Sequence, residues 1–284
     1  MLQHDRQLKV IANNIEKKIK SELVKLMKDD REKYQQFWTA FGMQFKYALM
    51  NAYGQNRDTI RDLLLFWSSK ENKLTSLKEY VDRMPESQGE IYYVCADSVE
   101  HASKMPQAER VLKAGYEVLY LTVDEDEIVL QMLENAYDKP FVSVASEDAL
   151  PVTDAEKASV EQAEKDHKAL LDFAQETLKG EVSKVRISKI LQSGAVCLTA
   201  EGPVSLEMEK YFRKMRRDFP MSAQRVLELN PDAPAFQALC KAYEEDKEKA
   251  AAYVEVLYNQ ALIIADLPLP DPARYAELVC GLMK

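Results

Sequence analysis

The sequence has few of the residues and motifs from which redox, metal and nucleotide sites are commonly built. It holds only 8 glycines and 3 histidines in 284 residues, and the histidines are too scattered to give metal-ligand spacing. Its 4 cysteines form no C-x-x-C pair, which predicts reduced and mostly buried thiols. No catalytic motif is present either. Composition therefore argues for a globular protein without a redox or metal centre.

Long apolar runs are also missing. A membrane helix needs about 20 consecutive apolar residues, and the longest candidate, 257–269, is interrupted by polar residues and a proline. Residues 1–10 lack the apolar core of a signal peptide. The formal net charge of −9 disfavours binding to a nucleic-acid backbone, which requires clustered Lys and Arg. We therefore expect a cytoplasmic protein that binds neither membranes nor nucleic acids.

Helical periodicity dominates the first 70 residues. Residues 2–28 place their apolar side chains on one stripe, which predicts a long amphipathic helix. A lone helix of this kind cannot bury its stripe, so the chain looks truncated at its start. Residues 31–70 are expected to continue as helix, with clustered aromatic residues that we interpret as core. These aromatic residues are Tyr34, Phe37, Trp38, Phe41, Phe45 and Tyr47.

The helical period gives way to alternating strands and helices from residue 91 onward. Residues 75–84 predict a short amphipathic helix that Pro85 ends, and an apolar strand follows at 91–95. The elements expected next are a helix at 98–114 capped by Gly115, a strand at 117–121, a helix at 125–136 and a strand at 141–144. This alternation predicts a parallel sheet with right-handed crossovers.

The alternation of strands and helices also raises the possibility of a ligand-binding enzyme. A dinucleotide site needs glycines in the first strand–helix turn, but that turn here is Ala96-Asp97-Ser98. An enzyme that binds a small ligand at the carboxyl ends of these strands, near Asp97, Ser98 and Asp124, stays the alternative hypothesis. No nearby His, Cys or Lys partner is expected for these carboxylates.

The polar and acidic residues 147–168 predict a domain boundary, with domains at 1–150 and 151–284. The expected elements of the second domain are a helix that stops at Gly180, strands at 182–190 and 195–199, a helix at 204–217, a strand-like piece ending near Leu229, and helices at 234–265 and 271–283. The whole chain is thus predicted to have a mixed α/β and α+β fold: a helical segment, a small three-layer α/β part, and an α+β domain that ends in helices.

Eight segments resemble, in the same order, segments of the heat-shock protein 90 chaperones. They are MLQHDRQLKVIANNIEKKI, YGQNRDTIRDLLLFWSSK, SLKEYVDRM, IYYVCADS, GYEVLYLTVDEDE, KPFVSV, ELNPDAP and VLYNQALI. The chain ends in Gly-Leu-Met-Lys, without the acidic Glu-Glu-Val-Asp tail of the eukaryotic cytosolic members, so it resembles the bacterial form. The resemblance implies that 1–150 is the C-terminal part of the middle domain and that 151–284 is the C-terminal dimerisation domain.

The resemblance also implies what this chain does and does not do. The family comprises ATP-dependent protein-folding chaperones of the stress response. Their ATPase domain, and the middle-domain arginine that reaches the γ-phosphate, would precede everything seen here, and Gln3 would be a remnant of the same loop. We therefore expect a fragment that holds no cofactor and hydrolyses no ATP, although the full-length family uses ATP and Mg.

The resemblance implies two surfaces for unfolded client proteins. The first comprises Glu127, Ile128 and Gln131, where Ile128 replaces a tryptophan of the bacterial pattern and is either exposed or turned inward. The second is the helix at 204–217, with a basic edge. Its expected contact residues are Val204, Met208, Tyr211, Phe212 and Met215. The alternatives are an ordinary packed helix and a purely structural scaffold that binds no client.

A third surface is implied for homodimerisation by the last two helices. Its expected residues are Val254, Leu257, Tyr258, Ala261, Leu262, Tyr275, Leu278, Val279 and Leu282. A twofold dimer is the commonest closed assembly. An intramolecular core would use the same apolar stripes, so both interpretations stay open at this point. The partners expected are a second copy of the chain and unfolded or partly folded proteins.

Overall fold

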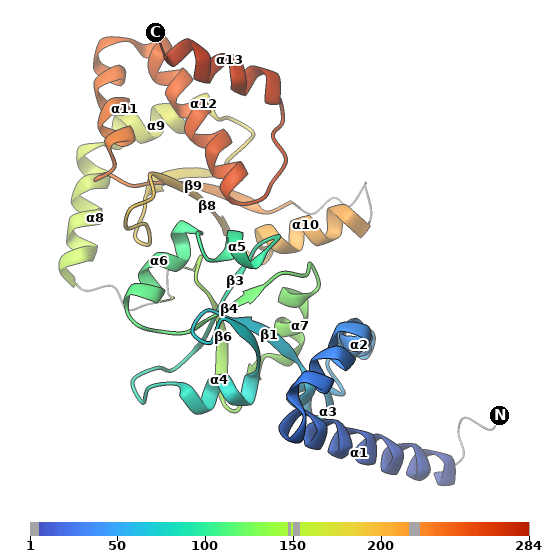
Figure 1. Ribbon diagram of the computed structural model, residues 1–284. Helices are drawn as coiled ribbons and strands as arrows, with labels where there is room; N and C mark the ends of the chain where they lie inside the picture. Colours follow the sequence, from blue (N-terminus) through green and yellow to red (C-terminus); the bar gives the residue numbers. More distant parts are fainter. Residues whose placement is uncertain (1–5, 147–148, 150–153, 216–221, 284) are drawn as a thin grey trace. The chain divides into compact units, whose positions relative to one another are not determined.

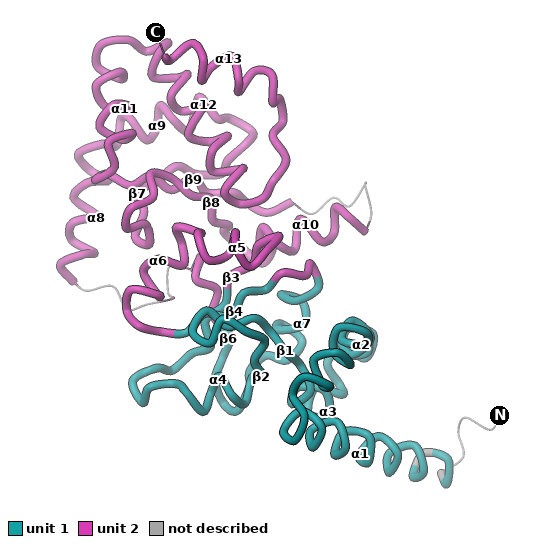
Figure 2. Tube along the Cα trace, in the orientation of Figure 1, with its two compact units in different colours: residues 1–93, 117–121, 125–141 teal, residues 94–116, 122–124, 142–284 magenta. Residues whose placement is uncertain are grey.

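The computed structural model describes residues 6–146, 149, 154–215 and 222–283 (Figure 1). The chain folds as two compact units, shown in Figure 2. One contains residues 1–93, 117–121 and 125–141, and the other contains residues 94–116, 122–124 and 142–284. The predicted boundary near residue 150 stays a prediction. The predicted combination of α/β and α+β architecture is confirmed.

The N-terminal segment is helical, as predicted. Its elements are α1 (Arg6–Asp29), α2 (Arg31–Asn51), α3 (Arg57–Ile60) and the 3-10 helix η2 (Arg61–Leu63). Ile11, Ile15 and Ile19 on α1 are each about half exposed, so this apolar stripe is not buried within the chain. The interpretation of the aromatic cluster as core is confirmed only in part, because Tyr34 is buried whereas Phe41 is 51% exposed.

The prediction of continuous helix over 31–70 is wrong at its end. Strands β1 (Leu65–Ser68) and β2 (Lys73–Ser76) pair as an antiparallel hairpin, and Asn72 takes a positive φ of 51° in the turn. The apolar run at 63–66 is buried throughout, and a fully buried strand cannot be distinguished from a buried helix by periodicity.

The next two elements match the prediction closely. Helix α4 (Leu77–Arg83) begins with a capping box, in which the Ser76 hydroxyl accepts from the backbone N–H of Glu79 and the Glu79 carboxylate accepts from the backbone N–H of Ser76. The helix ends before Pro85, and β3 (Ile91–Cys95) follows as a buried strand. Local signals are sufficient here because capping and termination depend on neighbouring residues.

The remainder of the first sheet differs from the prediction in two respects. Its elements are α5 (Val99–Ala102), α6 (Pro106–Lys113), β4 (Val118–Leu121), α7 (Asp126–Leu133), β5 (Asn135–Ala136) and β6 (Lys139–Ser143). The helix expected at 98–114 is two helices, since Pro106 starts a new one. The strand order is β2-β1-β4-β3-β6-β5, and its β1–β2, β1–β4 and β5–β6 pairs are antiparallel, so the sheet is mixed rather than parallel.

The C-terminal part contains a second, smaller sheet covered by helices. Its elements are α8 (Asp154–Asp166), α9 (Lys168–Thr177), β7 (Lys184–Ile187), β8 (Val196–Glu201), α10 (Leu206–Met215), β9 (Gln224–Leu229), α11 (Pro234–Glu245), α12 (Lys247–Ile264) and α13 (Pro272–Leu282). The strand order is β7-β9-β8, with β7 parallel and β8 antiparallel to β9. The helix expected at 234–265 is divided at Asp246, which caps α12.

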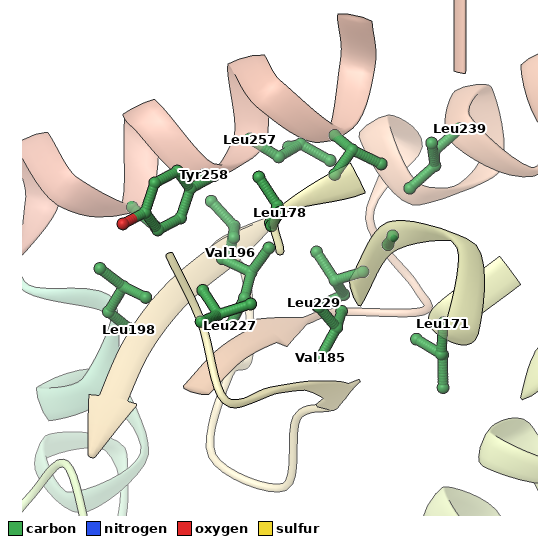
Figure 3. Close-up of a cluster of buried hydrophobic side chains, with 14 of the residues drawn as sticks. Leu171, Leu178, Val185, Val196, Leu198, Leu227, Leu229, Leu239, Leu257 and Tyr258 are labelled. Atoms are coloured by element: carbon green, nitrogen blue, oxygen red, sulfur yellow. The ribbon is translucent and has the colours of Figure 1, made fainter. Parts of the chain in front are cut away.

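One face of this sheet forms the main hydrophobic core with α9, α11 and α12 (Figure 3). Alternate residues of the three strands point into it, as the period of two requires. They are Val185, Ile187, Val196, Leu198, Leu227 and Leu229. The thiol of Cys197 is fully buried, and this burial raises its pKa. The expectation of mostly buried thiols holds for Cys197 but not for Cys280, which is exposed.

Candidate functional site

Helix α10 carries most of the second predicted client surface. The Ser205 hydroxyl accepts a hydrogen bond from the backbone N–H of Met208 (3.0 Å), which satisfies a free donor at the start of the helix. Acidic residues lie in its first turn and basic residues in its last, an arrangement that complements the helix dipole. The sequence therefore specifies both ends of α10 locally.

Four apolar residues of α10 share one face at the spacing i, i+3, i+4 and i+7, whereas Leu206 packs against the main core. We call Met208, Tyr211, Phe212 and Met215 the α10 face. Met215 is 66% exposed, and the other three are partly exposed. The rings of Tyr211 and Phe212 meet edge to face with their centroids 5.6 Å apart. Val204 is only 7% exposed, so it anchors the chain before α10 instead of extending this face.

Glu209 is buried on α10, and the sequence analysis missed its role. Its carboxylate accepts hydrogen bonds from the Arg225 guanidinium (2.7 Å) and the backbone N–H of Ala223 (3.0 Å), and it also pairs with Arg213. Glu209 thereby attaches α10 to the start of β9. No sequence signal identifies it, since a Glu on an amphipathic helix usually faces solvent.

The predicted basic edge of α10 is largely paired with carboxylates. Arg213 pairs with Glu209, and the ammonium of Lys214 lies 2.5 Å from the Asp124 carboxylate. Arg216 and Arg217, which were also expected on the basic edge, lie outside the described residues. Gln3, the predicted remnant of the ATPase loop, lies outside them as well. Burial raises the pKa of Glu207, and the neighbouring ammonium of Lys210 offsets this only in part.

The first predicted client surface is mostly buried. Ile128 on α7 is 8% exposed and Glu127 is 5% exposed, so Ile128 is turned inward, the second of the two orientations considered for it. The Glu127 carboxylate accepts a hydrogen bond from the Tyr93 hydroxyl at 3.2 Å. Gln131 is exposed. Helix α7 buries the charged Asp126 and Glu127 together with its apolar residues, so of the three predicted contact residues only Gln131 is accessible.

Five of the residues expected at the dimer interface are instead core residues of their own chain. Val254, Leu257, Tyr258, Ala261 and Leu262 are at most 5% exposed and pack against the small sheet and its helices (Figure 3). Their assignment to a dimer interface stays a prediction, and the single chain already buries all five. Their stripe is covered by the subunit's own strands, and the spacing of a stripe does not specify its partner.

The last helix is more open than α12. Leu278 is 8% exposed, while Tyr275, Val279 and Leu282 are half-buried. Two apolar residues that the sequence analysis omitted are more exposed than any of these: Ile263 near the end of α12 (49%) and Met283 after α13 (77%). The exposure of Ile263 could have been predicted from helical spacing, because this residue is not on the buried apolar stripe of α12.

The alternative enzyme site contains charged partners that were not expected. The Asp97 carboxylate accepts from the Ser98 hydroxyl and lies 2.9 Å from the His101 ring, whose other nitrogen contacts the Ile264 carbonyl. The hydrogen bond with His101 is the main cause of the lowered pKa of Asp97. Asp124 pairs with Lys214. Asp97 is thus hydrogen-bonded and Asp124 is ion-paired, so both carboxylates have partners within the chain.

Within the part of the chain that the structure describes, no three His, Cys, Asp or Glu side chains are grouped in a way that could hold a metal ion. Each described helix is too short or too polar to cross a membrane.

Comparison with known proteins gives a consistent result. A family model described as Hsp90 protein matches residues 1–284. The chaperone protein HtpG of Bacillus subtilis (strain 168) is 49% identical over 283 residues, covering 100% of this chain and 45% of that protein. HtpG of Oceanobacillus iheyensis is 48% identical and HtpG of Clostridium botulinum (strain Langeland) is 46% identical, each again over 100% of this chain and 45% of the relative. The chain therefore spans about 45% of the length of the curated relatives it matches.

Proposed function

Because this chain belongs to the Hsp90 family, we propose that it forms part of a molecular chaperone and that the α10 face binds apolar segments of unfolded proteins. The observation that carries this proposal is the exposure of Met215 (66%) beside the partly exposed Met208, Tyr211 and Phe212. Contiguous exposed apolar side chains with a polar rim are typical of interaction sites.

The chemistry of the α10 face suits many different partners. Methionine is unbranched and polarisable, so it adapts to apolar segments of different shape. Tyr211 and Phe212 add broad apolar area that loses little conformational entropy on binding. Glu209 lies outside this face and pairs with Arg225 and Arg213. The α10 face is therefore suited to broad and weak recognition of apolar segments.

Substituting the α10 face should reduce chaperone activity without unfolding the chain. For the double variant Met208→Gln/Met215→Gln, we expect suppression of aggregation of a thermally unfolded model protein to fall about 30-fold, since two apolar contacts worth roughly 1 kcal/mol each are removed. Light scattering at several chaperone concentrations measures this. The matched control is Ile11→Gln, a substitution of another exposed apolar residue (52%) on α1. Equal activity of the wild type and the double variant would rule out the α10 face.

We also propose that the chain associates with a second copy through the apolar side chains of α12 and α13 that the single chain leaves at least partly exposed. The residues that support this proposal are Ile263, Tyr275, Val279, Leu282 and Met283, which remain exposed or half-buried in the single chain. We propose these residues as the contact surface in place of the α12 residues that the single chain buries. Burying these side chains against their symmetry mates gives an isologous contact. The expectation that this chain holds no cofactor and hydrolyses no ATP stays a prediction.

A charge placed on this side should dissociate the dimer. For Ile263→Glu/Leu282→Glu, we expect the dissociation constant to rise at least about 100-fold, because four carboxylates would be desolvated in a twofold contact. Sedimentation velocity across a micromolar concentration series measures it. The control, Ile19→Glu, adds charge at a site of comparable exposure (52%) on α1. A wild-type chain that stays monomeric throughout this series would contradict the proposal.

A further inference from the structure

Helix α10 has an unusual means of attachment. Of its ten residues, all of which the structure describes, only the charged Glu209 is buried. Amphipathic helices are normally held by an apolar face against a core. Leu206 packs against the main core at the start of α10, whereas further along the helix the buried residue is the charged Glu209. The hydrogen bonds of Glu209 therefore help to fix the position of the helix beyond its first turn.

The bonds of Glu209 continue into the core. Arg225 on β9 donates from Nη2 to Glu209 Oε1 (2.7 Å) and from Nη1 to the hydroxyl of Tyr258 (3.1 Å). The Tyr258 hydroxyl in turn donates to Oε2 of Glu181 (3.0 Å), in the turn between α9 and β7. A single line of hydrogen bonds therefore joins α10, β9, α12 and the turn before β7.

Three members of this line, Tyr258, Arg225 and Glu209, are largely buried, whereas Glu181 is exposed. The Tyr258 ring lies in the main core on α12 (Figure 3) and is 3% exposed. Its hydroxyl accepts from one neighbour and donates to the other. Burial raises the pKa of Tyr258 to about 12, so the hydroxyl keeps its proton at physiological pH. The Arg225 and Glu209 side chains are 14% and 3% exposed, and charges buried to this degree are costly to separate.

We propose that Tyr258 is a positioning residue for the α10 face, acting through Arg225 and Glu209, so that a displacement of α12 is transmitted to α10. This inference rests on the proposed function, because it gives the α10 face its orientation. The ion pair of Lys214 with Asp124 does not replace this connection, since both side chains are substantially exposed (66% and 38%) and exposed pairs contribute little.

Hydrogen exchange of the whole chain tests the inference with the variant Tyr258→Phe, which keeps the ring in the core and removes the hydroxyl. We expect amides of α10 to exchange about tenfold faster, while those of α12 and β8 keep their wild-type rates. A merely structural role would accelerate all three elements together. The matched control is Tyr243→Phe, which removes a hydroxyl from α11, outside the line.

A double-mutant cycle with Glu209→Gln makes the test sharper. If the line is continuous, Tyr258→Phe accelerates α10 exchange much less in the Glu209→Gln background than in the wild type. Additive effects, or wild-type exchange of α10 in Tyr258→Phe, would overturn the inference while leaving the α10 face as the proposed binding surface. Faster α10 exchange with unchanged aggregation suppression would support the line of bonds and contradict the proposed function.

Discussion

Replacing Lys46 by Met should destabilise the N-terminal unit by about 3–5 kcal/mol, because it leaves the carboxylate of Asp126 buried without its cation. The Lys46 ammonium lies 2.6 Å from Asp126 Oδ1, and the two side chains are only 6% and 4% exposed. The ammonium also lies 5.7 Å from the Trp38 ring centroid and 5.9 Å from that of Phe66. The pair joins α2 to α7.

Urea denaturation followed by tryptophan fluorescence measures this effect, since both tryptophans, Trp38 and Trp67, lie in this unit. The matched control is Lys18→Met. It removes an ion pair with Glu22 of similar length (2.7 Å), whose side chains are 74% and 57% exposed, so we expect a far smaller loss of stability than in Lys46→Met. Adding Asp126→Asn to Lys46→Met should recover part of the loss. A loss in Lys46→Met no larger than that in the control would show that the buried pair is not important for stability.

The second large effect is expected at Glu228, on the face of the small sheet opposite the main core. Glu228 is 0% exposed and accepts hydrogen bonds from Arg186 (2.7 Å), Thr199 (2.9 Å) and Ser188 (2.7 Å). The variant Glu228→Leu removes the buried carboxylate that pairs with the Arg186 guanidinium, whose side chain is 13% exposed. We expect a loss of about 3–5 kcal/mol in the free energy of unfolding.

The remaining carboxylate near Arg186 provides the control. Glu201 lies 3.3 Å from the same guanidinium, but its side chain is 42% exposed. We therefore expect Glu201→Ala to cost no more than about 1 kcal/mol. Chemical denaturation monitored by circular dichroism compares the two variants. Similar losses for both would mean that burial does not determine the strength of this network.

The elements with local signals could be predicted closely from the sequence. Helix α4 has a capping box at its start and Pro85 after its end, and β3 is a short apolar run of strand length. The predictions were wrong where the same run of residues is compatible with two kinds of secondary structure. Strand β1 was predicted as helix, because its residues are buried on both sides and show no period. Pro106 divides a stretch that reads as one helix.

The candidate site also has features that could be predicted from local sequence and features that could not. The spacing of Met208, Tyr211, Phe212 and Met215 placed them correctly on one face of a helix. The buried position of Glu209 could not be anticipated, since its partner Arg225 lies 16 residues away on a strand. The partners of Asp97 and Asp124 were missed for different reasons. His101 lies one helical turn after Asp97, whereas Lys214 lies 90 residues after Asp124.

The amino-acid sequence alone determined where most helices and strands begin and end, which of their faces are apolar, and which family the chain resembles. Only the tertiary structure decided which apolar faces are already covered. Val254 and Leu257 are enclosed by their own sheet, whereas Ile263 and Met215 are not. The physical reason is that helical spacing depends on the backbone geometry of one segment, while burial depends on contacts with segments distant in the sequence.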